Sequence, residues 1–251
     1  MKYLYNIKDN ERIEQLGKNV KIIVSDIHHF TTDTILLADF SSPLSRDKCV
    51  DLGSGCGTIP FLWARDNKGA VINAVEIQSD ASELIEKSIK INGFCDKINV
   101  INSDLKDLKG KLEFGSFNVV SCNPPYKQIG SGVQSAHHSE IIARHEKECT
   151  ISDITAVASK LLQFRGRFCL CLRPERLCDV IHAMRKADLE PKRLRFVHQR
   201  KNKEPKLFLI EGIRGGRPGL RVQPPLFIED DNGNFSDEMK KIYGEYGENN
   251  R

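Results

Sequence analysis

Residues 48–57 read KCVDLGSGCG, and this stretch decides the fold of the chain. Its first half is apolar around Asp51 and predicts a buried strand, while its second half carries three alternate glycines. Glycines at this spacing allow a tight turn between a strand and a helix, and they let a ligand approach the backbone closely. The stretch therefore predicts a β-α unit with a ligand-binding turn after its strand.

Short β-branched runs alternate with amphipathic stretches from residue 48 onward, which favours parallel β-α units in a sheet covered on both faces. The expected strands are Lys48–Leu52, Val71–Glu76, Ile98–Asn102, Phe117–Cys122, Gly166–Leu172, Arg193–His198 and Lys206–Glu211. The expected helices are Gly57–Arg65, Ser79–Asn92, Ile151–Gln163, which Ser152 is expected to start, and Glu175–Ala187.

Residues 199–205 are too few for a parallel crossover, so we expect the last two strands to form an antiparallel pair at one edge. The fold class is then α/β, with a seven-stranded, mostly parallel sheet, a terminal antiparallel strand and helices on both faces. This pattern resembles the Rossmann-like class I methyltransferases. We expect the chain to have three parts. Residues 1–47 form an N-terminal lead-in packed on the core, with a hairpin (Glu14–Val24) and a helix (Asp33–Phe40). Residues 48–228 form the class I domain, and residues 229–251 form a polar, mobile tail.

The composition, with 39% hydrophobic and 29% charged residues among 251, is ordinary for a folded globular protein. No apolar stretch is long enough to span a membrane, and the start of the chain resembles no signal peptide, so we expect a cytoplasmic protein. The eight cysteines include no CxxC pair, which favours buried free thiols over a metal site.

Positive charge is concentrated in the C-terminal half of the chain. Residues 160–221 hold 17 Lys or Arg against 6 Asp or Glu, an excess of 11, whereas the preceding part is close to neutral or acidic. Such a segment favours a polyanionic partner such as a nucleic acid. A solvated basic face with no ligand is the alternative that charge alone leaves open.

Acidic residues follow or end the first three strands of the predicted sheet. Asp51 would repel a pyrophosphate, and the spacing GxGxG differs from a dinucleotide fingerprint, so a ligand with positive charge, such as S-adenosylmethionine, fits better. Glu76 can accept hydrogen bonds from both ribose hydroxyls. Asp104 can accept from the adenine amino group, with Leu105 beside the ring. Taken singly, each acid also fits a strand end or helix cap.

The fourth strand is followed by Asn123, Pro124, Pro125 and Tyr126, the motif NPPY. The two prolines fix the backbone and hold the carbonyl groups in set directions. An aromatic amine is a poor nucleophile, and the Asn123 side-chain oxygen together with the Pro124 carbonyl can accept from its two N–H groups. Tyr126 can stack on the base. At the fourth strand of such a sheet, the motif favours methyl transfer to an amino nitrogen over a simple rigid turn.

The chain resembles the bacterial tRNA adenine-N6 methyltransferases that modify position 37, beside the anticodon, of valine tRNA. The resemblance covers nearly the whole chain, through Phe30–Thr34, VDLGSGCGTIP, AVEIQ, SDL, NPPY, Ala143–Glu146, Lys203–Pro205 and Glu211–Gly216. In one departure, Cys56 replaces the small hydroxyl residue that is usual in the glycine-rich loop. The polar residues after the final PPL are a second departure, with no role assigned to them.

The resemblance implies an enzyme that uses S-adenosylmethionine, releases S-adenosylhomocysteine, needs no metal or obligate protein partner, and acts on the anticodon loop of tRNA. The implied cofactor contacts are Thr32, Asp51, Gly53, Gly55, Gly57, Glu76, Ile77, Asp104, Leu105 and Asn123, and the implied target-base contacts are Asn123, Pro124, Pro125 and Tyr126. An unpaired anticodon-loop base is easier to extrude than one in a duplex. The expected RNA-phosphate contacts are Arg200, Lys201, Lys203, Arg214 and Arg217.

Three alternatives stay open at this point. Protein glutamine-N5 methyltransferases present the same NPPY acceptors to an amide, although residues 1–47 are too short for their N-terminal helical bundle. Guanine-N2 methylation of ribosomal RNA is a second enzymatic alternative. A noncatalytic RNA-binding module with the same fold is the third, and the retention of Asp51, Asn123 and the glycines speaks against it.

Overall fold

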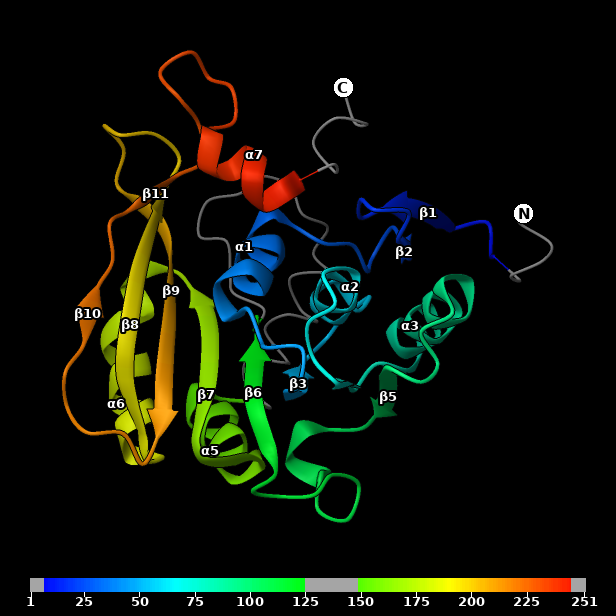
Figure 1. Ribbon diagram of the computed structural model, residues 1–251, viewed down its shortest axis with the longest axis horizontal. Coiled ribbons are helices and arrows are strands. Elements are labelled where there is room, and N and C mark those ends of the chain that lie inside the picture. The colour runs from blue at the N-terminus through cyan, green and yellow to red at the C-terminus, as the bar shows by residue number, and fades with distance from the viewer. Residues whose placement is uncertain (1–6, 125–148, 245–251) are drawn as a thin grey trace.

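The computed structural model describes residues 7–124 and 149–244, and a twisted, mostly parallel sheet lies at its centre (Figure 1). The strands are β1 (Glu11–Gln15), β2 (Lys21–Ser25), β3 (Lys48–Leu52), β4 (Val71–Glu76), β5 (Ile98–Asn102), β6 (Phe117–Cys122), β7 (Leu162–Leu172), β8 (Leu189–His198), β9 (Pro205–Arg214), β10 (Arg221–Val222) and β11 (Leu226–Phe227). The helices are α1 (Thr32–Ser41), α2 (Thr58–Arg65), α3 (Ser79–Asn92), α5 (Ile151–Leu161), α6 (Leu177–Lys186) and α7 (Asp237–Tyr243), with 3-10 turns η2 (Leu105–Asp107) and η3 (Pro174–Arg176).

The main sheet has the order β10-β8-β9-β7-β6-β3-β4-β5, and β11 adds to β8. Strand β9 is antiparallel to both of its neighbours, β7 and β8, which confirms the predicted antiparallel pair. Leu52 of β3 pairs with Val75 and with Cys122, and Glu76 of β4 pairs with Asn102. The segments that follow β3, β4, β5 and β6 therefore begin at one level, along the edge of the sheet where the carboxyl ends of these parallel strands lie.

Two hydrophobic cores lie on the two faces of the sheet. One joins α1, α2 and α3 with the β1–β2 hairpin, and the other is built from α5, α6 and residues such as Val50, Val120 and Phe168. Neighbouring residues along a strand point to opposite faces, so Cys49 belongs to the first core and Val50 to the second. Helices on both faces explain why the central strands read as continuous apolar runs. The predicted α/β class is confirmed.

The predicted bounds of the four strands from β3 to β6, and of α3, agree with the structure. The predicted N-terminal hairpin and helix are present as β1, β2 and α1. Strand β7 begins four residues earlier than expected, because Leu162 pairs with Phe117 before a register shift. Strands β8 and β9 are also longer, since they pair along their length as far as Leu189 and Arg214.

The predicted start of the third helix was wrong. Thr150, and not Ser152, caps α5 through a capping box: its side chain accepts from the Asp153 amide at 3.2 Å, and its own amide donates to the Asp153 carboxylate at 2.8 Å. Helix α5 ends at Leu161, two residues before the predicted end, because the chain enters β7 directly. The fourth predicted helix divides into η3 and α6.

The expectation of a mobile tail from residue 229 does not hold for residues 229–244. This segment ends in α7, which Ser236 caps by accepting from the Met239 amide at 3.2 Å. Met239 is fully buried and Tyr243 nearly so, and both belong to the core that contains α1. In Figure 1, α7 lies directly beside α1. Buried apolar residues in a short polar helix stabilise it on the core.

Within residues 7–124 and 149–244, no helix has the length and apolar character needed to cross a bilayer. All eight cysteines lie in this part of the chain and are free thiols, five of them buried. Burial raises the pKa of Cys56 to about 11, so this thiol of the glycine-rich loop stays protonated.

Candidate functional site

The glycine-rich turn after β3 depends on backbone conformations that only glycine adopts easily. Gly53, Gly55 and Gly57 have φ values of 70°, 55° and 88°. A Cβ at Gly57 would meet Ile85 at 3.0 Å and Phe61 at 3.2 Å, so this glycine is needed for packing. A Cβ at Gly53 or Gly55 would meet nothing within 4 Å. These two glycines therefore border open space at the edge of the sheet.

Asp51 is buried at the end of β3, with 2% of its surface exposed. Its Oδ1 accepts a hydrogen bond of 2.6 Å from the Ser121 hydroxyl, across the paired strands β3 and β6. Burial raises the pKa of Asp51 to about 7, although the hydrogen bond from Ser121 opposes the shift. A buried carboxyl group with such a pKa and no cationic partner among its hydrogen bonds is ready to receive positive charge.

The carboxylate of Glu76 is fixed at the end of β4. One oxygen accepts from the Gly55 amide at 2.8 Å, and the other accepts from the Gln78 amide at 2.9 Å. Asn102 holds the same turn from β5, by donating to the carbonyl oxygens of Glu76 and Ile77 at 2.9 and 3.1 Å. Sequence reasoning missed Asn102, because its position after a strand fits many polar residues equally well.

Three more predicted cofactor positions follow β4 and β5, at the same edge of the sheet. Asp104 accepts from the Lys106 amide at 2.9 Å and so caps η2, which is the alternative role considered for it. Leu105 is half-buried and packs on the second core. Ile77 leaves 47% of its surface exposed. An exposed isoleucine beside two carboxyl groups provides an apolar surface for a flat ring.

Asn123 follows β6, at the same edge as the glycine-rich turn. Its Nδ2 donates to Thr34 Oγ1 at 3.2 Å. Its Oδ1 is buried and accepts no hydrogen bond from the residues that the structure describes. Pro124 is buried as well, whereas Pro125 and Tyr126 lie outside the described residues. An unsatisfied buried acceptor is costly, and such groups occur where a ligand supplies the missing donor.

Helix α1 brings its first turn to this edge. Thr32, an expected cofactor contact, shares a hydrogen bond of 3.0 Å with the hydroxyl of Tyr243 in α7. Thr34, which sequence reasoning gave no individual role, holds Asn123. Thr34 and Asn123 are 89 positions apart in the sequence, and a local sequence pattern does not reveal a partner that far along the chain.

The five expected RNA contacts fall at two opposite edges of the sheet, one at each end of strand β9. Arg200, Lys201 and Lys203 lie in the turn between β8 and β9, on the edge that also carries Asn123. Arg200 pairs with Glu229 at 2.5 Å, and Lys201 with Asp231 at 3.4 Å. Arg214 and Arg217 come after the other end of β9, and the Arg214 guanidinium donates to the Leu162 carbonyl oxygen. These two arginines do not share a surface with the lysines.

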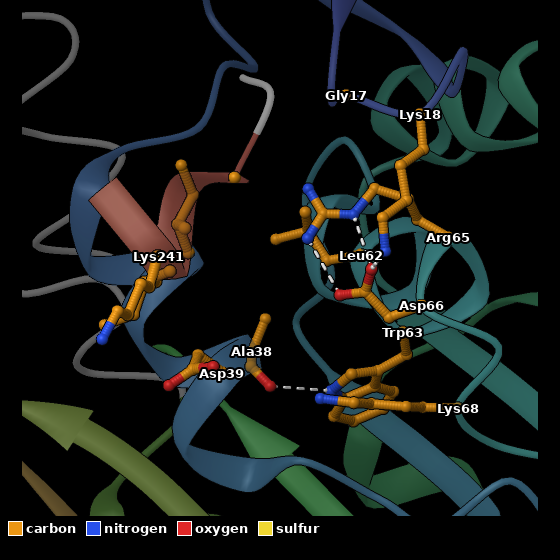
Figure 2. Close-up of a pocket in the computed structure, with 13 residues that line it drawn as sticks. Gly17, Lys18, Ala38, Asp39, Leu62, Trp63, Arg65, Asp66, Lys68 and Lys241 are labelled. Atoms are coloured by element: carbon orange, nitrogen blue, oxygen red, sulfur yellow. Dashed lines mark hydrogen bonds and ion pairs between the residues drawn. The ribbon is translucent and has the colours of Figure 1, made fainter. Parts of the chain in front are cut away.

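A cavity of about 350 Å³ lies elsewhere, between α1, α2, α7 and the β1–β2 turn (Figure 2). In Figure 2, Arg65 faces Asp66, to which it donates at 2.9 and 3.1 Å, and Trp63 donates to the Ala38 carbonyl at 3.2 Å. None of the predicted site residues lines this cavity. Its charged groups largely pair with one another, so we do not assign the site to it.

Three or more metal-ligating side chains do not come together anywhere in the part of the chain that the structure describes. Three histidines, His137, His138 and His145, lie outside that part. The described site consists of carboxylates, backbone amides, an apolar side chain and a carboxamide, which suit an organic cation with hydroxyl groups and a ring.

Comparison with protein families gives a match to the methyltransferase small domain over residues 29–169. This range includes the glycine-rich turn, the acids at the strand ends and Asn123. Sequence relatives include a tRNA1(Val) (adenine(37)-N6)-methyltransferase of Porphyromonas gingivalis, 28% identical over 65% of this chain and 64% of the relative. A protein of the same name from Parabacteroides distasonis is 27% identical over 72% of this chain and 74% of that protein. The aligned part therefore spans less than two thirds of the first relative.

Solved structures support the fold. A protein from Agrobacterium tumefaciens described as a predicted O-methyltransferase superposes with a TM-score of 0.64 at 20% identity, over 84% of this chain and 95% of that one. TYW2 from Pyrococcus horikoshii, solved in complex with MeSAdo, gives a TM-score of 0.58 at 11% identity, over 83% and 73%. At these identities the likeness establishes the class I methyltransferase fold and nothing finer.

Proposed function

Because the chain belongs to the methyltransferase small domain family, we propose that it transfers a methyl group from S-adenosylmethionine to the exocyclic N6 of an adenine in tRNA. One observation carries the proposal: Asn123 Oδ1 is a buried acceptor with no donor among the described residues, at the sheet edge that also holds Asp51 and the glycine-rich turn. An amino group is the missing donor. The names of the relatives support adenine 37 of valine tRNA as its source.

The residues present fit S-adenosylmethionine. The open space beside Gly53 and Gly55 would hold the methionine part against the backbone, and a Cβ at either position would fill that space. Asp51 would accept from the amino group, with its carboxylate form favoured by the positive charge. Glu76 keeps acceptor capacity on both oxygens for the ribose hydroxyls, since each oxygen accepts only one amide.

The adenine ring of the cofactor would lie against Ile77 and Leu105. Asp104, whose Oδ1 already accepts from an amide, would accept from the ring's amino group with its remaining capacity. The contact expected from Thr32 stays a prediction, because the hydroxyl of Thr32 is engaged by Tyr243. When bound, the cofactor supplies an electrophilic methyl group and leaves as S-adenosylhomocysteine.

The chain's own part in the reaction is to orient the target amine. We propose that Asn123 Oδ1 and the Pro124 carbonyl accept from its two N–H groups and draw its nitrogen toward a tetrahedral form. The lone pair of that nitrogen would then be free to attack the methyl group that the cofactor would supply, and one N–H proton would pass to solvent. Positioning and electrostatics supply the rate in such a step. Roles for Pro125 and Tyr126 in holding the base stay predictions.

We propose that the RNA lies across the turn between β8 and β9. Arg200, Lys201 and Lys203 share the edge that carries Asn123, and their phosphate contacts would place an unpaired base over the site. Arg214 and Arg217 are left out of this surface because they lie at the opposite edge. A tRNA substrate also supports a cytoplasmic location. We propose that residues 48–228 form the methyltransferase unit and that residues 1–47 pack on it.

The test is methyl transfer by the purified full chain from labelled S-adenosylmethionine, followed by nucleoside mass spectrometry of the product. N6-methyladenosine in an unmodified valine tRNA transcript, lost in Asn123→Ala, supports the proposal. N2-methylguanosine in ribosomal RNA, or label in the glutamine of a release factor, would favour the two alternative enzymes. Binding of tRNA without any methyl transfer would favour a noncatalytic module.

A further inference from the structure

The carboxamide of Asn123 is held at one end and open at the other. Its Nδ2 donates to Thr34 Oγ1 at 3.2 Å, whereas its Oδ1 is buried and accepts no hydrogen bond from residues 7–124 or 149–244. A carboxamide is planar, with its nitrogen and oxygen on opposite branches, so a partner for the nitrogen also sets the direction of the oxygen. The Thr34 hydroxyl, which accepts in this contact, therefore holds the side chain in the orientation that leaves Oδ1 on the other side.

The choice of orientation matters for the proposed chemistry. An amine that approaches Asn123 brings N–H donors, and only the oxygen of the carboxamide can accept them. With the group rotated by half a turn, N–H would face N–H, and the contact would repel instead of attract. Preorganised acceptors cost no rearrangement at the moment of reaction, which is why fixing them before the substrate arrives increases the rate.

Thr34 is itself fixed by its surroundings. It lies in the first turn of α1, where its amide donates to the Thr31 carbonyl at 3.1 Å. Two positions earlier, Thr32 is tied to Tyr243 of α7 by a hydrogen bond of 3.0 Å. A hydroxyl on an anchored helical turn is a more precise support than one on a loop.

We infer that Thr34 is a positioning residue, which orients the Asn123 carboxamide so that Oδ1 faces the amine to be methylated. The inference rests on the proposed function, because the target amine comes from it. The contact between Thr34 and Asn123 exists without substrate, so one of the measurements below is made on the protein alone.

Three variants separate this role from a general loss of structure. Thr34→Val keeps the shape and removes the acceptor, while Thr34→Ser keeps the hydroxyl. Thr155→Val is the matched control, because Thr155 is also a helical threonine, and its hydroxyl donates to the Ile151 carbonyl in α5, on the other face of the sheet from α1.

Single-turnover methylation of tRNA and calorimetric binding of S-adenosylmethionine are measured for each variant. We expect Thr34→Val to lower the single-turnover rate about ten-fold or more, with cofactor affinity and KM for tRNA changed by less than about two-fold. We expect Thr34→Ser to recover most of the rate and Thr155→Val to keep it. Equal rates in wild type and Thr34→Val would overturn the inference, and so would equal losses in Thr34→Val and Thr34→Ser.

The Asn123 side-chain amide gives a second readout without substrate. Its NH₂ signal in the nitrogen-15 NMR spectrum is identified by its loss in Asn123→Ala. We expect this signal to shift and its hydrogen exchange to accelerate in Thr34→Val, but not in Thr34→Ser or Thr155→Val. An unmoved signal in Thr34→Val overturns the role of Thr34. Absence of methyl transfer by the wild-type chain, together with a shifted signal, would instead count against the proposed function.

Discussion

Ser121 donates a hydrogen bond of 2.6 Å to the carboxyl group of Asp51, across the boundary between β6 and β3. The two residues pair directly in the sheet. Their polar contact therefore lies near the ends of two apolar strands, one residue before the last residue of each, and the turns that hold the site follow. Asp51 is 2% exposed, and among the described residues its side-chain hydrogen bonds come from serine hydroxyls, which are neutral. The protein therefore keeps a carboxyl group in a place where its charge is costly until a cation arrives.

Asp51→Asn is expected to make the ligand-free protein more stable at pH 8. The folded-state pKa of Asp51 is raised from 3.8 to about 7, so ionisation penalises the folded state as the pH rises through that window, and the full penalty is present above pH 7. We expect the unfolding free energy of the variant to exceed that of wild type by on the order of 2–4 kcal/mol at pH 8.

Denaturant unfolding at several pH values checks this expectation. The gain should disappear near pH 4, where Asp51 is protonated in the folded wild type, and the variant should bind S-adenosylmethionine poorly at every pH. A variant less stable than wild type at pH 8 would contradict the account of a buried, uncompensated charge.

Gly55→Ala is expected to impair cofactor binding more than folding. The added Cβ meets no protein atom, but it enters the space proposed for the cofactor. Gly110→Ala is the control, because Gly110 also has a positive φ, 82°, and open surroundings, away from the site. Both variants should lose about 1–2 kcal/mol of stability from backbone strain. Only Gly55→Ala should lower the affinity for S-adenosylmethionine, by about ten-fold or more in calorimetry.

Lys201→Glu combined with Lys203→Glu is expected to weaken tRNA binding and to leave cofactor binding intact. If both lysines contact phosphates, the dependence of log K on log salt concentration should become less steep by about 1.5–2. Arg217→Glu combined with Arg221→Glu changes the charge equally outside this turn, in and before β10, and this pair should have a smaller effect. Equal losses in the two pairs would mean that charge acts at long range and not through this turn.

Glu211→Gln is expected to destabilise the fold by about 3 kcal/mol. The Oε2 of Glu211 accepts from Arg167 at 2.7 Å and from Arg193 at 2.9 Å, and the carboxylate is largely buried. Its loss leaves two arginines facing each other beneath α1, where Arg193 also donates to the Phe40 carbonyl. Glu190→Gln breaks a single pair with Arg185, whose side chain is exposed, and should cost less than about 1 kcal/mol in the same urea titration.

The central strands could be predicted from the sequence because their signal is local. Strands β3, β4 and β6 are buried on both faces, so each reads as a short apolar run that ends at a polar residue or is followed by one or by a glycine, whereas β5 is partly exposed. The length of β7 could not be predicted in this way. Arg165, with φ 68°, interrupts the apolar pattern near Leu162, and only pairing with Phe117 keeps that end in the sheet.

The tail after residue 229 shows a similar limit. Its composition is polar, which predicted mobility, yet the structure buries Met239 and Tyr243 of α7 against α1. Two apolar contacts and the Ser236 cap are enough for a short helix that has a surface to pack on. That surface is formed by residues far earlier in the chain: Thr32 and Tyr243, which share a hydrogen bond, are 211 positions apart.

The sequence by itself determined the ends of strands β3 to β6, the glycine-rich turn and the residues that parallel strands must bring to one edge, because strand period and turn chemistry act over a few neighbouring positions. Tertiary structure alone decided that Thr34 meets Asn123, and that Arg214 binds a carbonyl group at the far edge instead of facing the site. These partners are set by how separate elements pack, and a side chain finds them only after the sheet and helices have assembled.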